Sequence, residues 1–414
     1  MSYNQPAQFS GVGAGRGRGG RGRNYNSGGR GRGNSSSQGG RGRGHGRVGP
    51  NAATQLCRNF VMGLCQHGDG CRFQHWAKVF ASINAHQKEI TSMTIHNNNT
   101  IITSSKDCCI GNFAIDINNF TLLEKGKLVL ETPVHSARMF QSSVIWSSES
   151  YPDQNTNAPV GVVTMLKDPS DMNTAVSCKR PGLDYTHHNI AKSFICCVLQ
   201  TNEGPIFLVV TGGSEGFIRI WRYDNDAFLH INVLEGHTRD VNYLLHRNVA
   251  NEIMWSCSSD QTIIAWNLLT FSMVKKFNIA DGHRAPVNCL ELLISPCEFI
   301  CSGGNDHMVK IWSPDEGECV QNIQEIEPVT ALSFLNDDSD EDGYAMIAIG
   351  LKGGSILIRD LKQLDCPIMI QLNSQTYAHT AAVVSICKVG GNIISAGEDG
   401  FIIFWGTSLD PNFS

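Results

Sequence analysis

Four residues of types that can bind soft metal ions stand close together in the N-terminal part of this 414-residue sequence. Cys57, Cys65, Cys71 and His75 follow the spacing C-x7-C-x5-C-x3-H, with three glycines between them. Three thiolates and one imidazole suit a closed tetrahedral zinc site, and glycine lets a short chain turn tightly around an ion. A segment this small has almost no hydrophobic core, so metal binding must supply much of its folding free energy. The spacing therefore predicts one Zn²⁺ ion held by these four side chains.

The residues between the ligands indicate what such a site could contact. Arg58 and Arg72 each follow a ligand cysteine, and Phe60 and Phe73 could shield the metal or stack on unpaired bases. Residues 57–75 resemble the CCCH zinc finger family, with its patterns C-x-x-F-x-x-G-x-C and C-x-F-x-H. The resemblance implies a module, expected at 53–76, that binds single-stranded RNA through those four residues. A finger that docks protein instead of RNA is the alternative.

A segment rich in arginine and glycine, residues 1–52, precedes the ligands. It cannot bury enough apolar surface to offset the entropy of ordering, so we expect it to be disordered. Through residue 78 the chain has twelve basic residues and one acidic residue, whereas the remainder has 21 basic and 37 acidic residues. Guanidinium groups pair with phosphates and stack on bases. We therefore expect weak, largely sequence-independent RNA contact from this arm, with an acidic protein partner or a solubilising linker as alternatives.

The chain that must position the finger is a series of strand-like repeats, expected at 77–408 and followed by a tail at 409–414. Apolar residues alternate between turns, which favours strands over helices. In three copies a histidine is followed by a turn aspartate and, six residues later, a tryptophan: His237, Asp260 and Trp266; His283, Asp306 and Trp312; His379, Asp399 and Trp405. This pattern resembles the WD-repeat β-propeller. The resemblance implies an all-β fold, most simply of seven blades, in which these residues are structural.

Four blades are expected to depart from that pattern. His86, Asp107 and Phe113 keep the spacing with phenylalanine in place of tryptophan. Another copy keeps Trp221 but has Glu215 as the acid, and we expect His188 to fill its histidine position, with His187 in a turn. A further copy has Lys352 and Ile358 where the acid and the tryptophan belong. The second blade is inferred only from strand-like segments between residues 118 and 180. Residues 79–83 are expected to complete the last blade and close the ring, which removes a free sheet edge.

Several other signals have simpler explanations. The G-x-S-x-G pattern at 212–216 is followed by a strand, so it does not predict a hydrolase elbow. His187 and His188 could be metal ligands, but a structural position for His188 and a turn position for His187 explain them better. The acidic run 337–343 could bind calcium, but a solvated loop explains it better, with docking of a basic partner as a further alternative. Twelve cysteines outside the finger are interpreted mostly as buried small hydrophobes in strands. No apolar run is long enough for a membrane span, and no group of residues resembles a catalytic or small-molecule site.

The combination of finger and propeller resembles a eukaryotic family best represented in plants. It implies a non-catalytic, intracellular RNA-binding scaffold, more often nuclear than cytoplasmic, whose propeller recruits proteins involved in mRNA metabolism. A protein-interaction adaptor or substrate receptor without RNA in its mechanism is the alternative. The loop residues that we predict to meet a protein partner are Arg239, Asp240, Arg284 and Lys352.

Overall fold

A computed structural model describes most of the chain between residues 56 and 407. The described residues are 56–62, 64–67, 71–97, 99–150, 160–168, 171–201, 204–246, 252–277, 280–293, 298–335, 346–361, 363 and 365–407. All of them belong to one compact unit, Val48–Ser414. The predicted arm at 1–52, the acidic run at 337–343 and the predicted tail at 409–414 all lie outside these residues, so the predictions for them stay predictions.

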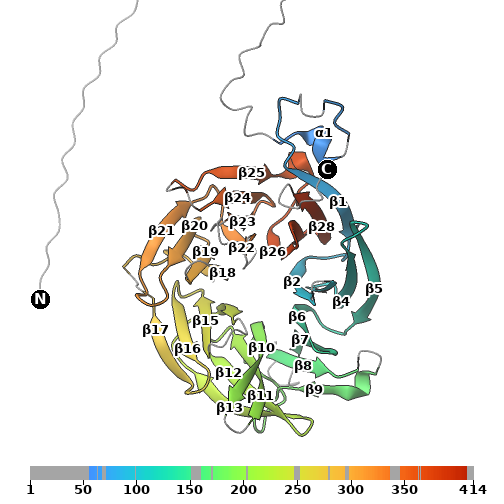
Figure 1. The fold of residues 1–414 in the computed structure, drawn as a ribbon. Coiled ribbons are helices and arrows are strands. Elements are labelled where there is room, and N and C mark those ends of the chain that lie inside the picture. The colour runs from blue at the N-terminus through green and yellow to red at the C-terminus, as the bar shows by residue number, and fades with distance from the viewer. Residues whose placement is uncertain are drawn as a thin grey trace, which may run out of the picture. The chain divides into compact units, whose positions relative to one another are not determined.

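The described strands form seven four-stranded antiparallel sheets arranged as blades in a ring (Figure 1). Blades 1 to 3 consist of β2 (Ile90–His96), β3 (Thr100–Ser105), β4 (Cys109–Asp116) and β5 (Thr121–Val129); β6 (Val134–Phe140), β7 (Ser143–Ser150), β8 (Val160–Leu166) and β9 (Ala175–Ser177); and β10 (Ala191–Thr201), β11 (Gly204–Gly213), β12 (Ile218–Asp224) and β13 (Ala227–Leu234). The predicted all-β propeller is therefore confirmed, and the second blade is genuine.

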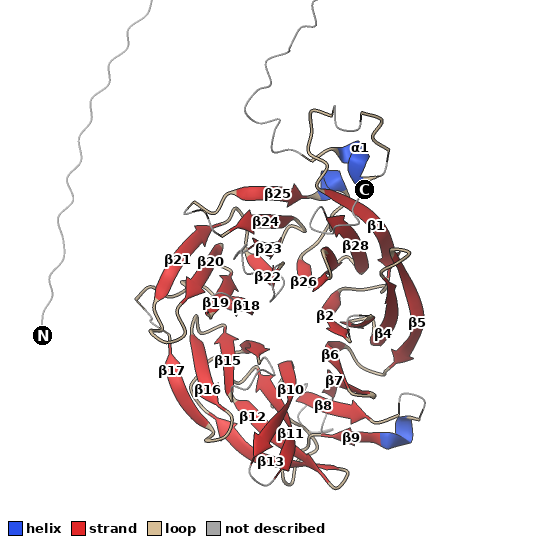
Figure 2. Ribbon diagram, viewed as in Figure 1, coloured by secondary structure: helices blue, strands red, loops and turns tan. Residues whose placement is uncertain are grey.

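The remaining blades follow in chain order. Blades 4 to 6 consist of β14 (Val241–Leu245), β15 (Ile253–Ser258), β16 (Ile263–Asn267) and β17 (Ser272–Lys276); β18 (Val287–Leu293), β19 (Phe299–Gly304), β20 (Met308–Trp312) and β21 (Cys319–Gln324); and β22 (Val329–Phe334), β23 (Met346–Leu351), β24 (Ile356–Asp360) and β25 (Ile368–Leu372). The helical segments in the described residues are single turns (Figure 2): α1 (Arg58–Val61), η2 (Met172–Thr174) and η3 (Ser374–Thr376).

Blade 7 joins the two ends of the propeller. Its strands are β26 (Val383–Val389), β27 (Asn392–Gly397), β28 (Phe401–Thr407) and β1 (Ala77–Asn84). Strand β1 pairs antiparallel with β28, with Ala77 opposite Thr407 and Asn84 opposite Phe401. The predicted closure by residues 79–83 is confirmed. Because β1 follows the finger after one residue, the strand that closes the ring also anchors the finger.

Each blade buries its faces against its neighbours, which explains why no blade could be stable alone. Between blades 3 and 4, for example, Val210 and Leu234 of one blade pack with Met254 and Trp266 of the next. The cysteine pair of β10 divides between two such layers, with Cys197 packed toward blade 4 and Cys196 on the opposite face. Cys108 departs from the prediction of a strand position: it lies half-exposed in the turn before β4 with a φ of 66°.

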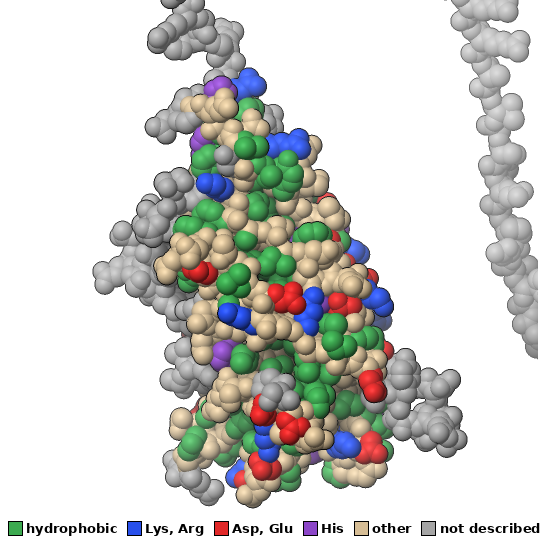
Figure 3. Space-filling view, turned by 90° about the vertical axis from the view of Figure 1, so that its right-hand side faces the viewer, with side chains coloured by type: hydrophobic (Ala, Val, Ile, Leu, Met, Phe, Trp, Pro, Cys, Tyr) green, Lys and Arg blue, Asp and Glu red, His purple; other side chains and the backbone are tan. Residues whose placement is uncertain are grey.

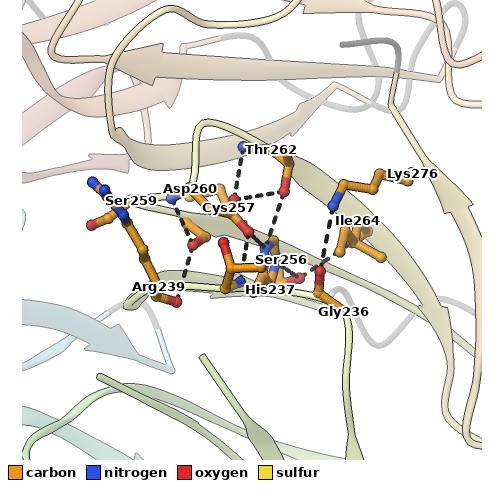
Figure 4. Close-up of polar contacts among 12 residues, drawn as sticks. Gly236, His237, Arg239, Ser256, Cys257, Ser259, Asp260, Thr262, Ile264 and Lys276 are labelled. Carbon is orange, nitrogen blue, oxygen red and sulfur yellow. Dashed lines mark hydrogen bonds and ion pairs between the residues drawn. The ribbon is translucent and has the colours of Figure 1, made fainter. Parts of the chain in front are cut away.

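A hydrogen-bonded network crosses each regular blade and confirms the predicted roles of histidine, aspartate and tryptophan. In blade 4, His237 contacts Asp260 through Nδ1 (3.0 Å) and the hydroxyl of Ser256 through Nε2 (2.7 Å). Figure 4 shows these residues converging, with Thr262 also bonded to Asp260. The indole of Trp266 donates to the same Ser256 hydroxyl (2.8 Å). Equivalent bonds occur in blades 5 and 7, through the hydroxyls of Ser302 and Ser395.

Blade 3 corrects one sequence-based assignment. The histidine of its network is His187, not His188: His187 is fully buried and contacts Glu215 (2.8 Å) and Thr211 (2.8 Å). His188 is exposed. The histidine doublet alone could not show which of the two histidines is in the network. In the structure His187 is the one that forms a backbone bridge with Gly161. Glu215 does replace the aspartate, as expected, and its longer side chain also pairs with the buried guanidinium of Arg219 (2.9 Å).

Blade 6 replaces the network with a buried ion pair. Ile358 takes the tryptophan position and is fully buried, while the exposed Lys352 takes the position of the acid. By its spacing from the inner strand, Glu325 occupies the histidine position, and its carboxylate accepts two bonds from Arg359 (2.6 and 3.0 Å). A bidentate pair of this kind can join strands as the histidine network does elsewhere.

The G-x-S-x-G pattern forms the turn between β11 and β12, as the sequence indicated. Ser214 lies in this hairpin and its hydroxyl donates to the backbone oxygen of Ile190 (3.1 Å). A nucleophile elbow requires a helix after the serine, and here β12 follows instead.

Candidate metal centre

The two ends of the finger are tied together by backbone hydrogen bonds. Leu56 forms a parallel bridge with Gln74, and the amide of Cys57 donates to the Gln74 oxygen (2.8 Å). Helix α1 begins immediately after Cys57 and is a single turn, closed by the bond from the Val61 amide to the Cys57 oxygen (3.0 Å). This arrangement brings Cys57 next to His75, although the two are at opposite ends of the finger sequence.

The four predicted ligands converge on one point. The sulfur atoms of Cys57, Cys65 and Cys71 and a ring nitrogen of His75 all lie within 4.8 Å of one another. Zn–S bonds of about 2.3 Å in a tetrahedron would place the sulfurs roughly 3.8 Å apart, so a small contraction would complete the shell. Nε2 of His75 is buried and has no hydrogen-bond partner. A buried imidazole nitrogen without a partner is unfavourable, and a metal ion would satisfy it.

The electrostatics of the cluster also suit a cation. Burial raises the pKa of the Cys57 thiol, and the neighbouring thiols of Cys71 and Cys65 raise it further. Three thiolates would repel one another at this distance without a positive charge between them. A bound divalent ion reverses that effect and deprotonates coordinating thiols. The donor set, its closeness and its burial therefore fit a structural zinc site.

Three of the four predicted aromatic and basic residues make ring contacts within the finger. Phe60 stacks directly on His75, with ring centroids 4.0 Å apart and an angle of 7° between the planes. It thus shields one ligand, which was one of the two roles expected of an aromatic ring here. The guanidinium of Arg72 lies over the ring of Phe73 at 4.9 Å. Arg72 is exposed and Phe73 is half-buried.

The finger is packed against the propeller through a residue that the sequence did not single out. Val61 is fully buried in a cluster with Ala77 and Trp405 of blade 7, and Leu56 and Trp76 pack against the same cluster. Helix α1 lies beside β1 and η3, as seen at the top of Figure 1. This contact gives the finger a fixed place beside the propeller.

A second contact between finger and propeller is polar. The guanidinium of Arg58 lies over the ring of Tyr377, 5.4 Å from its centroid. Tyr377 follows η3 in the connection between β25 and β26, and its side chain is 44% exposed. No motif marked this tyrosine, because its role depends on a fold that brings residues 58 and 377 together.

The predicted partner-binding residues lie on loops of one propeller face. Arg239 and Asp240 precede β14, Arg284 precedes β18, and Lys352 lies in the turn between β23 and β24. Arg239, Arg284 and Lys352 are exposed. Asp240 is held by an ion pair with Lys192 at 2.5 Å, and backbone bonds tie these loops to their neighbours.

Acidic side chains on the face seen in Figure 3 lie away from the finger. Figure 3 shows Lys, Arg and His side chains at the end that carries the finger, and acidic and basic side chains mixed over the propeller below it. Within the described part of the chain, no helix is long and apolar enough to cross a membrane.

Comparison with known proteins finds similarity in two segments. A family model, "WD domain, G-beta repeat", matches residues 77–111 and 273–313, so these two segments are similar to WD repeats. The WD40 β-propeller domain of Doa1 has a TM-score of 0.58 and 12% identity, covering 80% of this chain and 97% of that chain. This likeness shows the fold alone. The matched repeats lie in the propeller, so the assignment of the finger depends on its ligands.

Two named relatives match part of this chain. The chain is 24% identical over 158 residues to Pre-mRNA-splicing factor cwf17 of Schizosaccharomyces pombe. This match covers 38% of this chain and 43% of the relative. The chain is 32% identical over 109 residues to Polycomb group protein FIE1 of Oryza sativa subsp. japonica. This match covers 26% of this chain and 28% of the relative. The chain thus spans less than half the length of either relative.

Proposed function

We propose that this protein is a non-catalytic scaffold that holds single-stranded RNA with its zinc finger and recruits proteins with its WD-repeat propeller. The observation that carries the proposal is the convergence of Cys57, Cys65, Cys71 and His75 within 4.8 Å, beside exposed arginines. WD repeats in a seven-bladed ring support the scaffold half of the proposal, because propellers offer broad loop surfaces and carry function on those loops.

Zinc has a structural role in this proposal. Bound by the four ligands, the ion supplies the folding free energy that so short a segment lacks. Phe60 then keeps the His75 ring in place by stacking on it. Phe73 and the guanidiniums of Arg58 and Arg72 are the groups available for RNA, with the ring stacking on a base and the guanidiniums pairing with phosphates.

The arm at 1–52 strengthens this interaction in the proposal. Its arginines provide a weak second contact on the same chain, and a tethered contact raises the effective concentration of the first. The splicing factor among the relatives supports a place in mRNA metabolism and in the nucleus.

A second function is favoured by a different observation. Arg239, Arg284 and Lys352 are exposed on loops of blades 4, 5 and 6, on one propeller face. In an adaptor without RNA in its mechanism, these loops and the finger would both dock proteins. The acidic propeller fits this alternative, because it contributes little to affinity for nucleic acid.

Fluorescence anisotropy with a labelled single-stranded RNA of mixed sequence tests the first proposal. We expect the affinity to fall steeply with salt, with a slope of about −0.7 for each phosphate contact. Phe73→Ala should weaken binding roughly tenfold, since one lost stacking contact costs about 1–3 kcal/mol. Met62→Ala, which removes an exposed apolar side chain of the same finger, is the matched control and should leave binding unchanged. Binding that is insensitive to salt and to Phe73→Ala would favour the adaptor.

A further inference from the structure

Tyr377 of the propeller is held in an unfavourable backbone conformation. It is the residue after η3, with φ 62° and ψ 24°, in the left-handed region. Glycine adopts this region readily, whereas a bulky side chain such as tyrosine rarely does. Such strain persists only where the surrounding structure imposes it, and it is found most often at functional sites. The position therefore retains a side chain at a cost in stability.

The turn around Tyr377 is fixed by several hydrogen bonds. The side chain of Asn373 accepts from the Gln375 amide (2.9 Å), and the Asn373 amide donates to the Thr376 hydroxyl (2.7 Å). The amide of Ala378 donates back to the Asn373 oxygen (3.0 Å). Thr376 and Ala378 are both buried, so the turn anchors the residues on either side of Tyr377 and projects its ring outward.

The exposed ring supports an arginine of the finger. The Arg58 guanidinium lies 5.4 Å from the centre of the Tyr377 ring, within the range of a cation–π contact. A guanidinium held on an aromatic ring loses less conformational freedom when it binds a ligand than a free arginine does. Arg58 is exposed, so its N–H groups can meet a partner from solvent.

We propose that the RNA-binding surface of this protein extends from the finger onto the propeller through the Arg58–Tyr377 pair. In this arrangement Arg58 contacts a phosphate of the single strand, and Tyr377 is the positioning residue that holds the guanidinium for that contact. The inference rests on the proposed function of the finger. It adds a propeller residue to the RNA site and explains why the finger is docked at a fixed place: a finger on a free linker would lose this platform.

The test compares RNA affinity, its salt dependence and thermal stability in the full-length, zinc-loaded protein. Tyr377→Ala and Arg58→Ala should each raise Kd roughly five- to tenfold, the size of one charge-assisted contact. Each should also reduce the salt slope by about 0.7, because one phosphate contact is lost from a single strand. The double variant should bind no more weakly than either single variant. Tyr377→Phe keeps the ring and should bind like the unmodified protein.

Two controls separate binding from folding. Tyr377→Gly relieves the left-handed strain, so it should weaken RNA binding while Tm stays unchanged or rises; a merely structural tyrosine would lower Tm. Phe401→Ala removes an aromatic side chain that is 37% exposed and lies opposite Asn84, at the far end of β1 from the finger. It should leave RNA binding unchanged.

The outcomes distinguish this inference from the proposed function. If Cys65→Ser abolishes binding but Tyr377→Ala keeps the affinity and salt slope of the unmodified protein, the finger binds RNA without the propeller and the inference is wrong. The inference is also wrong if the RNA affinity of Tyr377→Ala falls only in proportion to a fall in the zinc content of the variant. If Cys65→Ser binds RNA normally, or the unmodified protein does not bind it, the proposed function itself fails.

Discussion

Replacing Val61 by alanine should weaken zinc binding, although valine is not a ligand. Val61 is fully buried against the propeller, and without metal the finger is not expected to fold or dock. Metal binding, folding of the finger and its packing against the propeller are then one linked equilibrium. Weaker packing against the propeller therefore lowers the affinity for zinc. Two buried methyl groups at about 0.8 kcal/mol each amount to about 1.6 kcal/mol, or roughly a 15-fold rise in the Kd for zinc.

The assay is a competition titration of zinc between the protein and a chromophoric chelator. Leu64→Ala is the matched control, because Leu64 is next to the ligand Cys65 yet its side chain is 68% exposed; its Kd for zinc should change less than about twofold. A Val61→Ala protein with the zinc affinity of the Leu64→Ala control would refute the linkage between docking and metal binding.

Three further predictions concern the propeller. His187→Ala should lower the free energy of unfolding by about 2–4 kcal/mol because it unpairs buried polar groups, whereas His188→Ala should change it by less than about 0.5 kcal/mol; equal urea midpoints would contradict the assignment of His187. Burial favours a higher pKa for Glu215, but the hydrogen bond and charge of His187 and the charge of the neighbouring arginine outweigh it and hold the pKa at about 2, against an ordinary 4.5. The ionised carboxylate therefore contributes on the order of 2 kcal/mol to the free energy of unfolding above about pH 4.5, and this contribution is lost as pH falls toward about 2. Urea midpoints measured between about pH 5 and 2 should thus depend less on pH in Glu215→Gln. An unchanged pH dependence would show that the carboxylate is not responsible. Glu325→Leu alone should lower the free energy of unfolding by about 3–5 kcal/mol because it leaves the buried Arg359 guanidinium without its carboxylate partner, and adding Arg359→Leu should recover part of that loss. If the losses from the two substitutions add in denaturant titrations, the buried pair is not responsible.

Regular blades were predictable because their chemistry repeats at fixed spacing. His237, Asp260 and Trp266 could be assigned from sequence, since each must satisfy its polar atoms within one blade. The serine whose hydroxyl bonds to both ring systems, Ser256, was not predicted. Serine is common in strands and turns, and only the ring orientations reveal that one hydroxyl joins the two side chains.

Irregular blades show where the sequence was insufficient. The doublet of His187 and His188 left the register open by one residue, and the sequence-based assignment was wrong. In blade 6 the pairing of Glu325 with Arg359 joins residues that no repeat motif connects. Such replacements are visible only once the fold places the two side chains in the same layer.

The convergence of the three cysteines and the histidine was predictable from their spacing. The packing of this segment against the propeller was not. Four ligands within nineteen residues converge for local reasons. The shared cluster of Val61 and Trp405 and the contact of Arg58 with Tyr377 depend on ring closure by β1, which pairs residues 77–84 with residues 401–407. Long-range contacts of this kind leave no local signal in a single sequence.

The measurement that tests the account most directly is a zinc titration of metal-free protein with labelled single-stranded RNA present throughout. The account predicts that specific RNA binding appears as zinc is added and reaches its maximum at one ion per chain. RNA binding of full strength before any zinc is added, or no RNA binding after the site is filled, would contradict it.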